Sequence, residues 1–363
     1  MKNIIINLIN ANQGAHIVRS KNFLLNLKKI DLQNNYLILT EKKIDILTKN
    51  FNYIIFNISK YKFFAIIQRF IIQNFFINYY YFRYNISVYI NFSHTIPILS
   101  LKKILKIIAV TNVAPFVTFK KFSNIQKIKM FYLKYKILYN CLISDKIISI
   151  SGYCKELLEK NSISSKKIHI ISNGINDNVK INLNLKSKNF FLYVSHFYSY
   201  KNFENLIISY SNLPAKIQNK FKLVLIGNPY DLKYYESIKN LIFNLKLEHN
   251  VKIYSNLTRE QINDYIKKCY LFIFPSLIEN CPMSLLEAME FNKPILTSNI
   301  SPMNEFCKDL PIYFNPHDQN SIVNSITKFC NNNELSFSYD YSLIKKELTW
   351  KKFTKKILLM YKI

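Results

Sequence analysis

The stretch "PSLIENCPMSLLEAMEFNKPI", residues 275–295, decides the fold of this chain. It follows and overlaps "YLFIFPS" (270–276), an apolar run without polar alternation. Such a run is typical of a strand in a parallel sheet that is covered on both faces. "MSLLEAMEF" (283–291) predicts a helix, and Pro282 suits its start because the first helical N–H groups need no partner. The stretch therefore predicts a strand, a loop and a helix in succession, which is the repeating unit of α/β folds.

The helix is predicted to end in an unusual way. Asn292 stands where glycine is the common left-handed cap, and Pro294 prevents the helix from continuing. The chain has only four glycines, Gly14, Gly152, Gly174 and Gly227. Asparagine is the next residue to tolerate a left-handed backbone, so we expect Asn292 to replace glycine there.

Two acids flank the start of this helix. Glu279 lies in the predicted loop, and Glu287 lies eight residues later on the helix. The helix amides between them form an anion site, while carboxylates accept hydrogen bonds from hydroxyl groups. The pattern favours an anionic, hydroxyl-rich ligand. The alternative is that the acids only complement the helix dipole.

Similar apolar runs alternate with helical patterns along the whole chain, which predicts two doubly wound α/β domains. The boundaries are 1–175 for the N-terminal domain, 176–189 for a polar linker, 190–340 for the C-terminal domain and 341–363 for a final helix. Ligands of such sheets bind at the carboxyl ends of the strands, so the expected site is a cleft between two facing domains. The predicted strands are 3–9, 36–40, 52–58, 87–92, 106–112, 146–151, 167–172, 190–196, 221–227, 250–255, 270–276, 293–299 and 310–316.

The formal charge of +28 arises from 50 basic and 22 acidic residues. Four arginines (Arg19, Arg69, Arg83 and Arg259) contribute little, so the charge is almost entirely lysine. Proteins that bind phosphates or nucleic-acid bases through two parallel hydrogen bonds are usually rich in arginine. We also find no nucleic-acid-binding motif in the sequence. Compositional bias explains most of the charge, and a nucleic-acid partner is not expected.

The remaining bulk features indicate a cytoplasmic protein. Six cysteines show no C-x-x-C and no paired spacing, and the first residues predict a strand rather than a secretory signal. "FFAIIQRFIIQNFFINYYYF" (63–82) is interrupted by polar residues, so it predicts a buried or interfacial helix and not a membrane span. The basic, aromatic N-terminal half also suggests peripheral contact with an anionic membrane at the inner face of the cytoplasmic membrane.

Residues 275–295 resemble the E-x(7)-E signature of retaining glycosyltransferases of family 4, whose C-terminal module is called glycosyl transferases group 1. "FFLYVSHFYSYKNFENLI" (190–207), "FKLVLIGNP" (221–229) and "PIYFNPHDQNSIVNSI" (311–326) resemble further segments of this module in the family's order. "LTWKKFTKKILLMY" (348–361) resembles the final helix that crosses back to the N-terminal domain. The resemblance is specific over about 146–355 and implies the GT-B architecture, two Rossmann-like domains facing a cleft.

This resemblance implies roles for individual residues. Glu287 would hold the donor ribose, Glu279 would face the transferred sugar, and Lys201 would grip the diphosphate. His196 stands where the family usually has an arginine that binds the diphosphate together with the lysine. A histidine is a weaker cation than arginine, and its charge depends on pH. Glu279, Lys201 and His196 are therefore the expected catalytic residues. Donor-binding positions are Asn280, Cys281, Pro282, Met283, Ser284 and Leu285 around the helix start, with Ser195, Gly227 and Ser255 after other strands.

On the acceptor side, the resemblance points to Gly14, Asn112 and Pro115. "TNVAPF" (111–116) carries Asn112 near where many family members have a histidine, which leaves no obvious side-chain base. There is no D-x-D motif, so neither a metal nor another cofactor is expected. Neutralisation of the departing diphosphate would then supply the main catalytic help.

The resemblance predicts a retaining, metal-independent transfer of a hexosyl group from a UDP- or GDP-sugar to a cell-surface glycan or a lipid-linked saccharide. The alternative is a non-catalytic GT-B-like protein that binds a nucleotide sugar or serves as a scaffold. The replacement of the family's usual arginine by His196 favours the alternative. The presence of Glu279, Glu287 and Lys201 favours the enzyme.

Overall fold

The computed structural model divides into two compact units. Unit 1 comprises Met1–Phe116, Lys127–Gly174 and Leu348–Ile363, and unit 2 comprises Val117–Gln126 and Ile175–Glu347. The structure describes residues 1–9, 14–42, 44, 46, 48–59, 61–93, 95–97, 104–176, 188–331 and 340–362.

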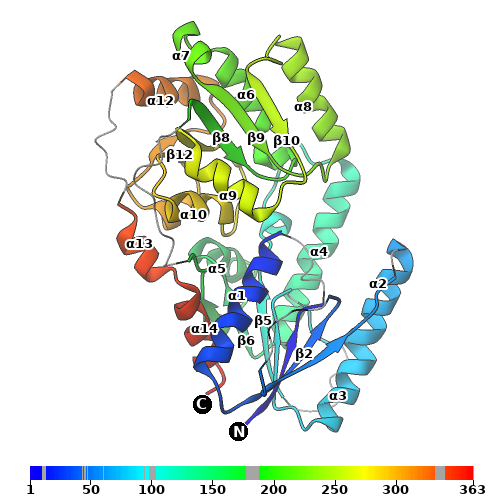
Figure 1. The fold of residues 1–363 in the computed structure, drawn as a ribbon. Helices are drawn as coiled ribbons and strands as arrows, with labels where there is room; N and C mark the ends of the chain where they lie inside the picture. The colour runs from blue at the N-terminus through cyan, green and yellow to red at the C-terminus, as the bar shows by residue number, and fades with distance from the viewer. Residues whose placement is uncertain are drawn as a thin grey trace. The chain divides into compact units, whose positions relative to one another are not determined.

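Unit 1 is built on a parallel sheet of seven strands in the order β3-β2-β1-β4-β5-β6-β7, with helices on both faces (Figure 1). The strands are short and rich in isoleucine, and Ile4, Ile5 and Ile6 of the central β1 are fully buried. The strands are β1 (Asn3–Asn7), β2 (Asn35–Thr40), β3 (Phe51–Ile55), β4 (Val88–Asn91), β5 (Leu105–Val110), β6 (Lys146–Ser149) and β7 (Ile168–Ile170). The helices are α1 (Gly14–Ile30), α2 (Lys62–Ile71), η1 (Ile72–Phe76), α3 (Ile77–Arg83), η2 (Ala114–Phe116), α4 (Asn124–Ile143), α5 (Gly152–Glu159), η3 (Ser165–Lys167) and the C-terminal α14 (Trp350–Leu359).

Unit 2 has a six-stranded parallel sheet in the order β10-β9-β8-β11-β12-β13, the doubly wound arrangement. All four residues of β11 are buried, as its uninterrupted apolar sequence predicts. The strands are β8 (Phe190–Val194), β9 (Lys222–Ile226), β10 (Val251–Tyr254), β11 (Leu271–Phe274), β12 (Ile295–Ser298) and β13 (Ile312–Phe314). The helices are η4 (Ser199–Lys201), α6 (Phe203–Ser211), α7 (Ala215–Lys220), α8 (Leu232–Asn244), α9 (Arg259–Lys268), α10 (Met283–Glu290), α11 (Met303–Cys307), α12 (Gln319–Asn331) and α13 (Ser342–Glu347).

The predicted fold class, two doubly wound α/β domains, is confirmed. Each of the thirteen predicted strands corresponds to one observed strand. Twelve of the observed strands are shorter than predicted by one to several residues, and β2 is longer by one residue. The extra predicted residues lie mostly at the carboxyl ends, because apolar residues continue into the loops that follow. Most of the predicted linker, residues 177–187, lies outside the described residues.

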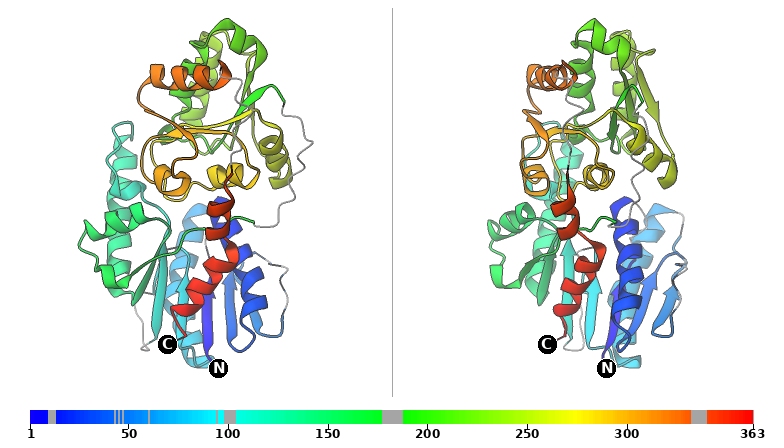
Figure 2. Two further views of the ribbon diagram at one scale, coloured as in Figure 1. Left: turned by 90° about the vertical axis from the view of Figure 1, so that its left-hand side faces the viewer. Right: turned by 60° about the vertical axis from the view of Figure 1, so that its left-hand side comes forward.

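The end of the chain returns to unit 1, but not as one helix. Residues 341–363 form two helices, and α13 belongs to unit 2 while α14 belongs to unit 1. Thr349 separates them, since its hydroxyl accepts a hydrogen bond from the Lys352 N–H and starts α14 as a new helix. Helix α14 lies beside α1 (Figure 2), where Phe353 packs edge-to-face on Phe23 at 6.2 Å between ring centroids.

A short segment of the N-terminal half also belongs to the other unit. Residues 117–126 pack with unit 2, where the ring of Phe122 lies 6.2 Å from that of Tyr200, centroid to centroid. Lys121 forms an ion pair of 2.7 Å with Glu204 in the same unit. Unit 1 therefore differs from the predicted N-terminal domain, 1–175, which included this segment, because the aromatic and charged partners of the segment lie in the C-terminal half.

Helices long and apolar enough to cross a membrane are not found in the described part of the chain.

Candidate functional site

The carboxyl edge of the unit 2 sheet gathers most of the predicted donor-side residues. Ser195 and His196 follow β8, Gly227 follows β9, and Ser255 follows β10. Glu279 lies in the loop after β11, between that strand and α10. Because these strands are parallel, their carboxyl ends meet at one edge of the sheet, where ligands of doubly wound folds bind.

An ion pair joins two predicted catalytic residues at this edge. The Nζ of Lys201 donates to the Oε1 of Glu279 at 2.5 Å, and both side chains are largely buried, with 14% and 10% of their surface exposed. The Lys201 ammonium also lies 5.1 Å from the centre of the Tyr200 ring. A cation held in this way has lost much of its hydration, which favours pairing with a second anion.

The turn that carries Lys201 is fixed to the loop after β11. The Leu277 N–H donates to the Tyr200 carbonyl at 2.9 Å, and the Tyr193 hydroxyl donates to the Lys201 carbonyl at 2.9 Å. Asn202 adopts a left-handed backbone (φ 63°), and its amide group donates to the Pro275 carbonyl at 3.1 Å. These bonds hold the lysine turn and the Glu279 loop in one arrangement, which preorganises the ion pair.

Helix α10 starts at the same edge. The Ser284 hydroxyl donates to the Val194 carbonyl at 2.8 Å, which ties the first turn to the end of β8. Pro282 occupies the N-cap position and has no polar side-chain atom to cap the first amides. Of the predicted donor-binding positions here, Asn280, Cys281, Pro282 and Leu285 are buried, while Met283 and Ser284 are partly exposed.

Glu287 lies one turn further along α10 and is buried. Its Oε1 pairs with the Nη2 of Arg259, the first residue of α9, while its Oε2 is buried without a hydrogen-bond partner among the described residues. Burial raises the pKa of the Glu287 carboxyl, and the Arg259 guanidinium opposes that rise. A buried acceptor atom with no partner is costly, so this oxygen is poised to accept a hydrogen bond from a ligand.

Glu290 is a second buried acid on α10. Its carboxylate accepts hydrogen bonds from the Asn176 backbone N–H at 3.4 Å and from the Asn176 side chain at 3.2 Å. Burial raises the pKa of Glu290, and its charge adds to the rise at Glu287. Asn176, the first residue of the predicted linker, is thus fastened to α10.

His196 lies at the carboxyl edge of the unit 2 sheet, after β8. Burial, with a further contribution from Lys201, lowers the pKa of His196 below its usual range. Its Nδ1 accepts the Asn228 N–H at 3.3 Å, and its ring lies edge-on to Tyr230, 4.6 Å between centroids. The side chain is therefore a hydrogen-bonding imidazole at neutral pH rather than a second cation.

Gly227 has a steric reason to be glycine. A Cβ built on it would lie 1.8 Å from the Ser195 carbonyl oxygen. The Ser255 hydroxyl donates to the Gly227 carbonyl at 2.9 Å. The turns after β8, β9 and β10 therefore pack directly on one another, which explains one of the four glycines retained in this chain.

The predicted acceptor-side residues lie in unit 1. Asn112 follows β5, and its side-chain oxygen accepts the Ala114 N–H at 3.0 Å. Pro115 is buried in the short helix η2. Gly14 begins α1, and the loop before it, residues 10–13, lies outside the described residues.

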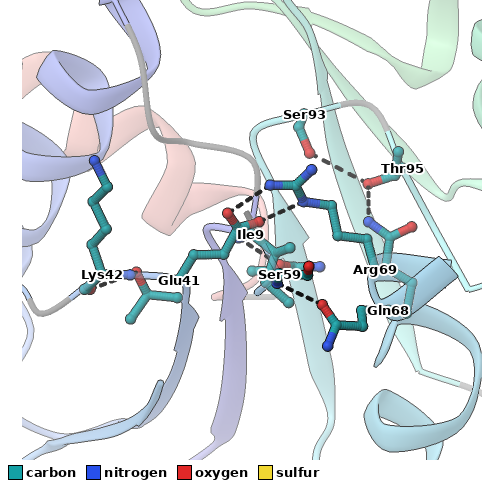
Figure 3. A network of polar contacts seen from close by, with 11 residues as sticks. Ile9, Glu41, Lys42, Ser59, Gln68, Arg69, Ser93 and Thr95 are labelled. Atoms are coloured by element: carbon teal, nitrogen blue, oxygen red, sulfur yellow. Dashed lines mark hydrogen bonds and ion pairs between the residues drawn. The ribbon is translucent and has the colours of Figure 1, made fainter. Parts of the chain in front are cut away.

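A polar cluster at the carboxyl edge of the unit 1 sheet was not anticipated from the sequence. Figure 3 shows Arg69 of α2 reaching Glu41, which follows β2, with two parallel bonds of 2.7 and 2.8 Å. Nearby, the Ser93 and Thr95 hydroxyls, which follow β4, are 3.3 Å apart. Both Arg69 and Arg259 belong to the four arginines of the chain, and this scarcity is the signal that could have drawn attention to them.

Metal-binding clusters of three or more His, Cys, Asp or Glu side chains are not found among the described residues.

Comparison with known proteins agrees with this architecture. Sucrose-phosphate synthase from Thermosynechococcus elongatus superposes with a TM-score of 0.75 at 15% identity, covering 99% of this chain and 98% of that one. HepE from Anabaena, in complex with UDP and glucose, superposes with a TM-score of 0.73 at 12% identity, covering 99% of both chains. At such identities the likeness concerns the fold alone.

Among curated sequences, the O-antigen chain mannosyltransferase RfbU of Salmonella typhimurium is 26% identical over 235 residues. The match covers 64% of this chain and 62% of RfbU, so the chain spans about six-tenths of the length of this relative.

The two doubly wound sheets, together with these superpositions, define the GT-B fold. Residues 175–345 match the family described as "Glycosyl transferases group 1".

Proposed function

We propose that this protein is a retaining glycosyltransferase, which moves a hexosyl group from a UDP- or GDP-sugar to a saccharide or lipid-linked saccharide acceptor. One observation carries the proposal. The Lys201–Glu279 ion pair, the start of α10 and the unpartnered Glu287 Oε2 all belong to elements at the carboxyl edge of one doubly wound sheet. This combination of a cation, helix amides and buried acceptors suits a nucleotide sugar.

Each group has a part in donor binding. The Glu287 Oε2 accepts a ribose hydroxyl, which satisfies the buried acceptor. Lys201 and the first amides of α10 bind the diphosphate, and Glu279 accepts a hydroxyl of the transferred sugar. The RfbU relative is named a mannosyltransferase, and the HepE structure is a complex with UDP and glucose. The proposal therefore keeps both UDP-sugars and GDP-sugars as donors.

The chemistry follows from the charge that develops during transfer. The bond between the anomeric carbon and the phosphate oxygen breaks, and the nucleoside diphosphate leaves with the electron pair. The acceptor oxygen bonds to the anomeric carbon on the same face, and its proton passes to the departing phosphate oxygen. Lys201 stabilises the departing charge, so the proposed reaction requires neither a side-chain base nor a metal ion.

The test is release of nucleoside diphosphate from a panel of UDP- and GDP-sugars, with and without saccharide acceptors and with a chelator present. Glu279→Gln keeps the shape of the loop side chain and removes its charge, so we expect transfer to fall about 100-fold. The control is Glu236→Gln, which removes an exposed acid that pairs with Lys239 on α8. Binding of a nucleotide sugar without any turnover would instead favour a non-catalytic donor-binding protein.

The proposed place of action is the cytoplasm, at the inner face of the cytoplasmic membrane. RfbU is named for the O-antigen chain, and the strongly basic composition suits contact with anionic lipid. Fractionation of cells would test this, since an enzyme released from membranes by salt is peripheral and one found only in the soluble fraction is not.

A further inference from the structure

We propose that one face of unit 1, made by α2, η1, α3 and the part of α4 from Lys127 onward, docks on an anionic lipid bilayer. This docking face consists of the exposed side chains within residues 61–84 and 127–142. The inference deepens the membrane contact in the proposed function by assigning it to particular residues. Vesicle binding tests it without requiring sugar transfer.

The docking face concentrates the exposed apolar surface of the molecule. Of 31 exposed large apolar side chains in the described residues, 12 lie within 61–84 and 6 lie within 128–142. Unit 2 is similar in size, yet it exposes only 7. The exposed apolar side chains are therefore distributed unevenly between the two units. Exposed apolar patches of this extent mark interaction surfaces.

The helical run from α2 to α3 shows which side is left uncovered. Ile72, Ile77 and Tyr81 are buried against unit 1, while Phe63, Phe75 and Phe82 are among those that remain exposed. Phe63 is 70% exposed, and its ring lies edge-on to that of its neighbour Phe64, with 5.8 Å between ring centroids. Figure 1 shows α2 and α3 as one long run. Apolar and aromatic side chains on the outer side of a helix suit the interfacial region of a bilayer.

The charge of this region is of one sign. The sequence contains no Asp or Glu between Asp45 and Asp145, a stretch with 14 Lys and Arg residues. On α4, Lys127, Lys129 and Lys136 are exposed beside the apolar side chains. Basic residues next to exposed aromatic side chains complement anionic headgroups above the acyl chains.

An apolar groove lies within the docking face. Its volume is about 490 Å³, and α2 and η1 form one wall with Phe70 and Gln73. Helix α4 forms the other wall with Ile128, Phe131 and Tyr135. Both helices therefore belong to one continuous surface, and its hollow is lined by side chains that acyl chains can contact.

The same charge argues against a second copy of the chain as the occupant. A symmetric dimer would place two acid-free, lysine-rich surfaces against each other, and like charges in an interface are unfavourable. An anionic bilayer instead supplies both the negative charge and the apolar interior that this face requires.

The experiment is co-sedimentation of the full chain with vesicles of phosphatidylcholine, alone or mixed with phosphatidylglycerol. We expect binding to the mixed vesicles at low salt and much weaker binding at high salt. Phe63→Ser with Phe64→Ser should lower binding about tenfold or more, since the apolar contact is lost. Lys127→Gln with Lys129→Gln should lower it about tenfold or more through the lost charges.

Matched controls come from unit 2. Leu232→Ser with Phe243→Ser removes two side chains of similar exposure, 66% and 68%, and Lys216→Gln with Lys233→Gln removes two exposed lysines. Both controls should bind vesicles like the parent chain.

The proposal is overturned if the parent chain does not bind mixed vesicles at low salt, or if the docking-face and control variants lose binding equally. It is also overturned if light scattering shows a dimer that Phe63→Ser with Phe64→Ser converts to a monomer. Binding of UDP, measured alongside, should be unchanged in all four variants, so loss of the docking face and loss of the donor site are distinguishable.

Discussion

Arg259 of α9 contacts one oxygen of the Glu287 carboxylate, and the other oxygen is buried without a partner among the described residues. The pair links the start of one helix to the second turn of another. Arg259 is 47% exposed at its side chain, whereas Glu287 is almost fully buried. The arginine therefore holds a buried charge in place while leaving room for a ligand at the remaining oxygen.

Replacing Arg259 by Met should destabilise the protein most at alkaline pH. Burial already raises the pKa of Glu287, and loss of the guanidinium raises it further. A carboxyl whose folded pKa is raised favours folding at acid pH, and that contribution is lost as the pH rises through the folded pKa. The difference in melting temperature between the parent chain and Arg259→Met should therefore grow between about pH 5 and about pH 8.

The expected cost at neutral pH is about 1–2 kcal/mol, below that of a fully buried pair because Arg259 is partly solvated. Arg259→Lys keeps the charge and should lose less. Arg259→Met combined with Glu287→Gln should recover stability, because no buried charge remains unpaired. A deficit that does not vary with pH would contradict this account.

Replacing Lys201 by Met should weaken binding of the nucleoside diphosphate. The ammonium pairs with Glu279 in the free protein and would donate to the diphosphate when the donor is bound. Loss of one charge-assisted hydrogen bond should weaken UDP or GDP binding about 10- to 100-fold in calorimetry. The matched control is Lys239→Met on α8, whose partner Glu236 is exposed. Equal affinities for the parent chain and Lys201→Met would remove Lys201 from the donor site.

His196 should make diphosphate binding stronger on the acid side of neutrality. Burial and Lys201 lower the pKa of His196, so the ring is neutral at about pH 7.5 and gains its proton only at lower pH. A bound diphosphate favours the protonated ring. Affinity for UDP should thus rise more between about pH 7.5 and about pH 5.5 in the parent chain than in His196→Gln. Parallel pH profiles for the two proteins would show that His196 does not contact the diphosphate.

The sequence predicts the strands well because both sheets are parallel and buried on both faces. A run such as "YLFIF" (270–274) has no polar alternation, and β11 is indeed buried along its whole length. The loop position of Glu279 and the helical position of Glu287 follow from the same pattern. Local signals of this kind fix the element type and the strand ends that carry the site.

Contacts between distant segments could not be predicted. The pairing of Arg259 with Glu287 joins α9 to α10 across 28 positions of sequence, and no local pattern specifies it. For residues 63–82 the sequence predicts a buried or an interfacial helix, because an apolar helical run is compatible with both. Only the packing shows that most of its aromatic side chains remain exposed.

Asn292 was expected to take the left-handed cap of α10, and it does so with φ 51°. The Asn292 N–H donates to the Met289 carbonyl and the Lys293 N–H donates to the Ala288 carbonyl, both at 3.0 Å, which is the Schellman arrangement. Asn292→Val should destabilise the protein by about 1–2 kcal/mol, because a β-branched side chain is strained in this backbone region.

Asn292→Gly should change stability by only about 0.5 kcal/mol or less, since glycine relieves the left-handed cost. It also loses the hydrogen bond that the Asn292 side chain accepts from Lys345. Lys345→Met removes that bond alone and serves as the control. Thermal melts of the three variants decide the matter, because equal melting temperatures for the Val and Gly variants would mean that the left-handed cap contributes nothing.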